Sequence, residues 1–92
     1  MTTVINIRDM KDGDVYIGRP SKWGNPFAIS WNRGREEVIQ KYREWIRAQP
    51  KLLADLHELK DMRLACFCHP KPCHGDVLAE LADSEHPFNR HP

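Results

Sequence analysis

The sequence predicts a small α/β domain, with a short mixed sheet and about three helices packed on it. Three observations lead to this fold class: short runs rich in β-branched residues, longer segments whose apolar residues repeat with the period of a helix, and a helical pair placed between two predicted strands. The predicted strands are residues 3–7, 15–17 and 64–68. The predicted helices are residues 34–48, residues 50–60, and a last helix from about Asp76 to Ala82 or Asp83.

The second predicted strand has two possible partners. Val15, Tyr16 and Ile17 follow a turn that contains Gly13, so they either form a hairpin with residues 3–7 or lie beside them at the sheet edge. The third predicted strand follows a helical pair. Because such a crossover usually joins parallel strands, we expect residues 64–68 to run parallel to the first strand.

The first two predicted helices are amphipathic. Val38, Tyr42, Trp45 and Ile46 form one apolar stripe, and most charged residues of the segment fall on the other side. Pro50 suits the first position of the next helix. The buried face of that helix is expected to consist of Leu52, Leu53, Leu56 and Leu59.

Length and charge limit the classes of function. A chain of 92 residues forms one small domain, which we place at residues 1–83, followed by a C-terminal tail at residues 84–92. The 14 basic and 13 acidic residues give a formal charge of +1, which argues against bulk electrostatic adhesion to nucleic acid or to an anionic membrane. No apolar run approaches the roughly 18 residues of a membrane span, and the first residues lack the apolar region of a signal peptide. We therefore expect a cytoplasmic protein with no membrane partner.

The three cysteines lie within eight residues, from Cys66 to Cys73. This spacing is a poor framework for structural disulfides but suits a metal site or thiol chemistry in a reducing compartment. The loop after the third predicted strand would bring Cys73 and His74 to the first turn of the last helix, where free N–H groups favour a thiolate or a bound anion. Asp76 would cap that helix. Cys66 and Cys68, two apart on a strand, would point to the same face, so that three sulfurs converge.

A second group of functional candidates lies in residues 18–27, a loop by composition. Arg19 and Lys22 can bind a phosphate or a carboxylate. Trp23 can stack on a base, and Asn25 can hydrogen-bond to amide or hydroxyl groups at the edge of a ligand. Ser21 is a further ligand-binding candidate in this loop. The alternative is that Trp23 and Phe27 fill the core while Arg19 and Lys22 are solvated.

Three interpretations of the cysteine cluster stay open. In the first, either Cys73 or Cys66 is the thiolate of a pocket; Cys73 and His74 are the preferred catalytic residues, and Cys66, Cys68 and Asp76 help to bind the ligand. In the second, zinc is the cofactor, held by Cys66, Cys68, Cys73 and His69; His69 suits the fourth position better than His74, which is adjacent to Cys73. In the third, the cysteines are simply small buried apolar residues.

Both informative segments also carry a resemblance. Residues 18–27 (GRPSKWGNPF), an amphipathic helix, and residues 64–78 (LACFCHPKPCHGDVL) together resemble domain-of-unknown-function family 4326, over most of the chain. This resemblance implies a phage or bacterial intracellular protein. The Cys-x-Cys and Cys-His pattern at a helix start is also similar to domain-of-unknown-function family 488, which usually has Arg where this chain has Gly75. Neither resemblance implies a reaction.

The preferred function is recognition, and in a further step processing, of a nucleotide-like or phosphorylated small ligand. Its pocket would lie between the loop of residues 19–27 and the turn of residues 66–76. The alternative is a zinc-stabilised module that binds a host protein or nucleic acid.

Overall fold

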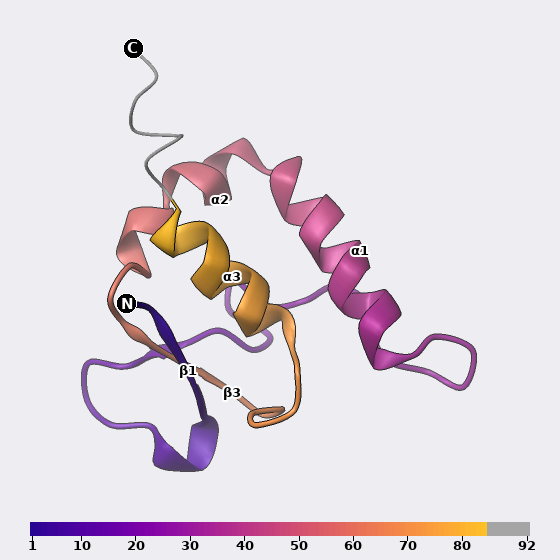
Figure 1. The fold of residues 1–92 in the computed structure, drawn as a ribbon, viewed down its shortest axis with the longest axis horizontal. Helices are drawn as coiled ribbons and strands as arrows, with labels where there is room; N and C mark the ends of the chain where they lie inside the picture. The colour runs from indigo at the N-terminus through magenta and orange to yellow at the C-terminus, as the bar shows by residue number, and fades with distance from the viewer. Residues whose placement is uncertain (85–92) are drawn as a thin grey trace.

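The computed structural model describes residues 1–84, which form a three-stranded sheet covered by helices (Figure 1). The strands are β1 (Thr3–Asn6), β2 (Val15–Tyr16) and β3 (Arg63–Cys66), in the order β1-β3-β2. The α/β fold class is confirmed, and β3 is parallel to β1 as expected. The sheet is not mixed over these residues, because β2 also runs parallel to β3. The hairpin alternative is wrong, since β3 lies between β1 and β2.

The central strand β3 positions the cysteine segment. Leu64, Ala65 and Cys66 are all buried, and Leu64 is paired in register with Val4 on one side and with Val15 on the other. β3 ends at Cys66, two residues earlier than predicted. Cys66 therefore lies at the carboxyl end of the parallel sheet, the edge where ligands bind in open α/β folds.

The helices are α1 (Arg35–Arg47), α2 (Pro50–Ala54) and α3 (His74–Asp83). α1 agrees with the predicted segment. α2 is shorter than predicted: the N–H of Asp55 bonds to the carbonyls of both Lys51 and Leu52, so the last turn tightens. A 3-10 turn, η2 (Leu56–Glu58), follows and still carries Leu56 into the core.

The helices form a second layer on the sheet. α3 packs directly against β1 and β3, and α1 packs against α3 and α2 (Figure 1). The core lies between these layers. Its buried residues are Ile17, Trp23, Tyr42, Ile46, Leu56, Leu59, Leu64, Cys66, Cys73, Val77, Leu78 and Ala82.

The two ends of the described chain are joined by hydrogen bonds. The backbone N–H and the hydroxyl of Thr2 donate to the carboxylate of Asp83, at 3.0 and 2.7 Å. Of the predicted tail, only Ser84 falls within the described residues; residues 85–92 lie outside them.

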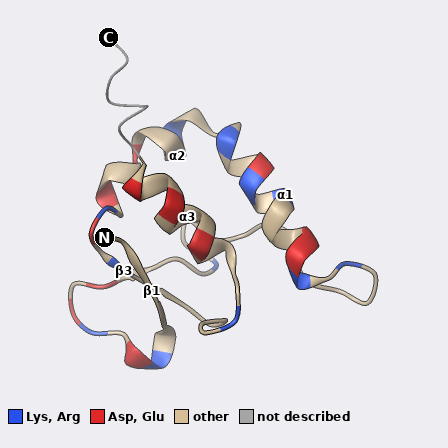
Figure 2. Ribbon diagram, viewed as in Figure 1, with Lys and Arg blue, Asp and Glu red and all other residues tan. Residues whose placement is uncertain are grey.

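Charged residues are spread over the described surface. Figure 2 shows basic and acidic residues distributed over the helices and loops, in keeping with the formal charge of +1. None of the helices in residues 1–84 is long and apolar enough to cross a membrane.

Candidate functional site

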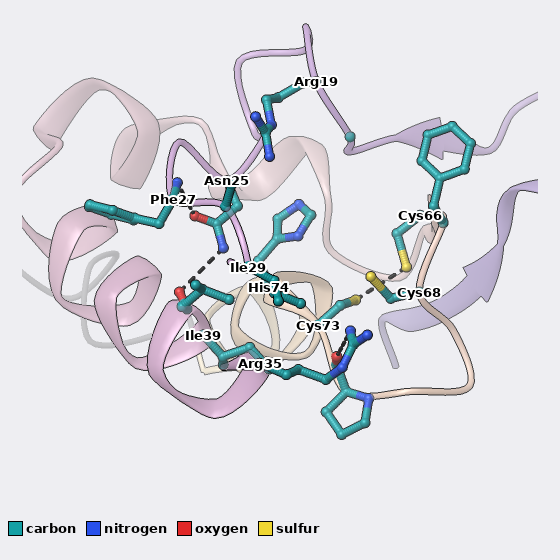
Figure 3. Close-up of a pocket in the computed structure, with 15 residues that line it drawn as sticks. Arg19, Asn25, Phe27, Ile29, Arg35, Ile39, Cys66, Cys68, Cys73 and His74 are labelled. Carbon is teal, nitrogen blue, oxygen red and sulfur yellow. Dashed lines mark hydrogen bonds between the residues drawn. The ribbon is translucent and has the colours of Figure 1, made fainter. Parts of the chain in front are cut away.

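A pocket of about 370 Å³ opens at the carboxyl end of the sheet (Figure 3). Three segments surround it: the loop that follows β2, the first turns of α1, and the chain from the end of β3 to the start of α3. Its lining residues are Gly18, Arg19, Asn25, Phe27, Ala28, Ile29, Arg35, Val38, Ile39, Cys66, Phe67, Cys68, Pro72, Cys73 and His74.

The structure brings the two predicted segments together at this pocket. The predicted site residues that line it are Arg19, Asn25, Cys66, Cys68, Cys73 and His74. Parallel strands end at the same edge of a sheet, so the residues that follow β2 and β3 meet there.

Trp23 and Lys22 lie elsewhere. The side chain of Trp23 is 3% exposed within the core, where its backbone carbonyl accepts a hydrogen bond from the Tyr42 hydroxyl at 2.7 Å. Lys22 pairs with Asp55 at 2.9 Å and with Glu58 at 3.0 Å. The indole therefore fills the core, as in the alternative stated above, whereas Phe27 is only partly buried and lines the pocket. The ammonium group of Lys22 joins the loop to α2 and η2.

Two other residues of the loop hold its conformation. The Ser21 hydroxyl accepts from the backbone N–H of Trp23 at 3.3 Å, away from the pocket lining. The Asn25 amide donates to the Val38 carbonyl at 3.3 Å and accepts from the N–H of Phe27 at 2.9 Å. Asn25 thus fastens the loop to α1 while its side chain faces the pocket (Figure 3).

The start of α3 is fixed by a capping box built from Cys73 and Asp76. The sulfur of Cys73 accepts from the N–H of Gly75 at 3.3 Å, and the Asp76 carboxylate accepts from the N–H of Cys73 at 3.1 Å. Cys73 is therefore the N-cap, and the prediction that Asp76 occupies this position is corrected. Asp76 supports the cap from the first turn and does not line the pocket.

The sulfurs of Cys66 and Cys73 lie 3.1 Å apart, joined by a dashed line in Figure 3. A hydrogen bond from the Cys73 thiol stabilises the ionised form of Cys66, and with help from the N–H groups of His69 and Cys68 it lowers the pKa of Cys66 to about 6. The same hydrogen bond raises the pKa of Cys73, and burial acts in the same direction. The hydrogen bond and burial together favour ionisation of Cys66 over ionisation of Cys73. Of the two thiols that the sequence left open as the thiolate, Cys66 is therefore the better nucleophile, rather than the preferred candidate Cys73.

Three of the four predicted zinc ligands, Cys66, Cys68 and Cys73, line the pocket, whereas His69 does not. Cys68 follows the end of β3, so it is no longer on the strand that was expected to align it with Cys66. Over residues 1–84, no group of three or more Cys, His, Asp or Glu side chains is arranged to hold a metal ion. The donor set of Cys66, Cys68, Cys73 and His69 therefore does not fit zinc in this structure.

His74 lines the pocket, and contacts with Ile17 and Tyr42 fix its imidazole. Its Nε2–H donates to the Ile17 carbonyl at 2.7 Å, and its ring meets that of Tyr42 edge-on with centroids 5.0 Å apart. Only 9% of His74 is exposed, and this burial lowers its pKa; the nearby positive charge of Arg19 acts in the same direction. His74 is therefore neutral at pH 7, with Nδ1 as the unprotonated nitrogen.

Residues 5–84 match the family described as Domain of unknown function (DUF4326). The chain belongs to this family. An uncharacterized 12.4 kDa protein in the nrdA-td intergenic region of Enterobacteria phage T4 is 38% identical over 77 residues, covering 78% of this chain and 69% of that protein. An uncharacterized protein of Acanthamoeba polyphaga mimivirus is 36% identical over 86 residues. The match covers 74% of this chain and 65% of the mimivirus protein. No solved structure matches.

In this DUF4326 domain the pocket also contains residues that the sequence did not single out. Arg35 donates to the Pro72 carbonyl at 3.0 Å, which holds its guanidinium beside the start of α3. Phe67, 67% exposed, lies at the pocket and meets the ring of Tyr16 edge-on at 6.1 Å. One signal could have identified Arg35: it is a cation at the first position of a helix, where the dipole disfavours positive charge.

Positively charged side chains outnumber negatively charged ones in the pocket lining. Arg19 and Arg35 contribute two guanidinium groups, and no Asp or Glu is among the lining residues. The Cys66 thiolate is the single negative group, and His74 is neutral. The lining therefore carries a net positive charge beside walls that are mostly apolar.

Proposed function

We propose that this DUF4326 domain binds a nucleotide-like or phosphorylated small ligand in the pocket between residues 19–27 and 66–76. The observation that carries the proposal is the pairing of two arginines with no carboxylate in an apolar hollow of about 370 Å³. This volume falls within the range of small-molecule sites, which are mostly apolar with a few placed polar groups. The three free cysteines suit a reducing cytoplasm, which we propose as the location.

The anionic part of the ligand would lie between the two arginines. In the view of Figure 3, Arg19 and Arg35 approach from opposite sides of His74. The hydrogen bond to Pro72 uses only one of the five N–H donors of Arg35, so donors remain for a phosphate. The Arg19 side chain has no hydrogen-bond partner within the described part of the chain, and α3 begins nearby with the positive end of its dipole.

The apolar part of the ligand would rest on the remaining walls. Phe27, Ile29, Ile39 and Phe67 line the pocket, and Phe67 presents an exposed ring on which a base can stack. A ligand with a flat ring at one end and a phosphate at the other would thus meet the apolar and the cationic groups together. If turnover follows binding, Cys66 is the proposed nucleophile and Nδ1 of His74 the proposed proton acceptor.

The experiment is a binding titration with nucleoside monophosphates, the matching nucleosides and inorganic phosphate. Binding is measured by calorimetry and by NMR of the pocket residues. We expect at least one monophosphate to bind more tightly than its nucleoside. Arg19→Gln and Arg35→Gln should each weaken that binding by about tenfold or more, because a hydrogen bond to a charged group contributes roughly 1.5 to 3 kcal/mol.

Lys22→Gln is the matched control, since it removes one positive charge of the same loop at a residue that pairs with Asp55 and Glu58 outside the pocket. It should leave binding within about twofold of the parent protein, as expected for a screened charge outside the site. The proposal is wrong if no monophosphate binds, or if Lys22→Gln weakens binding as much as the two pocket variants do.

A further inference from the structure

The pocket floor contains a pair of sulfurs that ligand binding does not explain. Cys66 ends β3 and Cys73 caps α3, so the fold brings together two residues from separate segments. Their sulfurs lie 3.1 Å apart, and a shift of about 1 Å would bring them to the length of a disulfide bond. Cys66 is 2% and Cys73 3% exposed, and both line the pocket, which is therefore the route by which a small reagent reaches them.

We propose that Cys66 and Cys73 are a site of oxidative modification, at which hydrogen peroxide or an organic hydroperoxide converts the two thiols into a reversible disulfide. The sulfur–sulfur distance and the shared opening into the pocket support this site. The inference concerns the sulfurs alone and does not depend on the identity of any ligand.

The reaction proceeds in two balanced steps. The Cys66 thiolate attacks the terminal oxygen of the peroxide and the O–O bond breaks. The second oxygen leaves as hydroxide from hydrogen peroxide, or as alkoxide from an organic hydroperoxide, and takes a proton from solvent to form water or an alcohol. Cys66 is then a sulfenic acid. The sulfur of Cys73 attacks the Cys66 sulfur, the S–O bond breaks, and water leaves with the proton of Cys73. The two sulfurs lose two electrons, which the peroxide gains, and a thiol reductant of the glutathione or thioredoxin class reverses the change.

Cys66 is the sulfur that should react first. The hydrogen bond from Cys73 favours its ionised form, and thiolates rather than thiols attack peroxides. Cys73 lies at hydrogen-bond distance and serves as the resolving thiol. Cys68 provides an internal comparison: it belongs to the same motif and lines the same pocket, but among residues 1–84 the hydrogen bond between sulfurs joins Cys66 to Cys73 and not to Cys68.

The test is to treat the complete reduced protein with hydrogen peroxide, unfold it, alkylate the remaining thiols and measure the intact mass. Reduced protein should accept an alkyl group on each of its three cysteines. Oxidised protein should accept one, on Cys68, and should return to three after treatment with a reductant. Peptide mapping should find the disulfide between Cys66 and Cys73.

Two variants separate the steps. Cys68→Ala should form the disulfide as the parent protein does. Cys73→Ala should not form this disulfide, and dimedone should trap a sulfenic acid on Cys66. The sulfenic acid should form more slowly than in the parent protein, because loss of the Cys73 donor raises the pKa of Cys66. The wild-type alkylation count decides the question even if a variant fails to fold. The proposal is overturned if peroxide that oxidises glutathione in the same tube leaves all three cysteines alkylatable, or if mapping finds Cys68 in the main disulfide.

Discussion

The imidazole of His74 donates its Nε2–H to the backbone carbonyl of Ile17 at 2.7 Å. Ile17 directly follows β2, and its own N–H bonds to the Ala65 carbonyl of β3 at 3.0 Å. His74 is the first residue of α3. One hydrogen bond therefore connects the start of the helix to the edge of the sheet, and it fixes the imidazole so that Nδ1 stays unprotonated.

Replacing His74 with Ala should destabilise the protein by about 2 to 3 kcal/mol, because the buried Ile17 carbonyl loses its donor and a cavity forms beside Tyr42. Urea unfolding measures this loss. His57→Ala is the matched control, since His57 is exposed on η2 and its removal should change stability by about 0.5 kcal/mol or less. Equal losses in the two variants would contradict the anchoring role of His74.

The pH dependence of stability should also report on His74. Burial lowers its pKa below the ordinary 6.5, so between these two values the unfolded chain binds a proton that the folded protein does not. Stability therefore falls as pH decreases below about 6.5. His74→Gln keeps a donor for Ile17 but does not titrate, so between about pH 7 and about pH 5 it should lose less stability than the parent protein. Parallel pH profiles would argue against a lowered pKa.

The sequence was sufficient to predict the parts of the fold that depend on periodicity. The stripe of Val38, Tyr42 and Ile46 identified α1, and the helical pair before β3 predicted that β3 is parallel to β1. β2 has only two residues, too few for a pattern that selects its partner. The early end of α2 depends on the bonding of the Asp55 N–H to two carbonyls, which apolar spacing does not reveal.

At the candidate site, too, some features could be predicted from the sequence and others could not. The sequence predicted a pocket between the loop of residues 19–27 and the turn of residues 66–76, and residues of both segments line one pocket. The direction of single side chains within an irregular loop was not predictable: Lys22 points to Asp55 and Trp23 into the core. Arg35 was overlooked because it begins a helix whose apolar stripe was the stronger signal.

Ionisation of Cys66 should depend on Cys73. Ultraviolet absorbance of the thiolate should show one group with a pKa of about 6 in the parent protein, and Cys66→Ala should abolish that titration. Cys73→Ala removes the donor, so the pKa of Cys66 should rise toward its ordinary value of 9.0. Cys68→Ala should leave the titration in place. A thiolate that titrates near pH 6 in the Cys73→Ala variant would show that the sulfur pair is not the cause.

Gly75→Ala should destabilise the protein because the start of α3 lies against the sheet. A Cβ at this position would lie 2.9 Å from Cδ1 of Ile17, 3.1 Å from Cγ1 of Val4 and 3.2 Å from the Cys73 sulfur, so the side chains of Ile17, Val4 and Cys73 would have to shift. We expect a loss of about 1 to 3 kcal/mol, as for other overpacked cores, measured by urea unfolding. Gly34→Ala is the control, since a Cβ there meets nothing within 4 Å, and it should cost only the roughly 0.5 to 1 kcal/mol by which Ala is a poorer helix N-cap than Gly. If Gly75→Ala were as stable as Gly34→Ala, the close approach of α3 to Val4 and Ile17 would be wrong, and with it the position of Cys73 and His74 at the pocket floor.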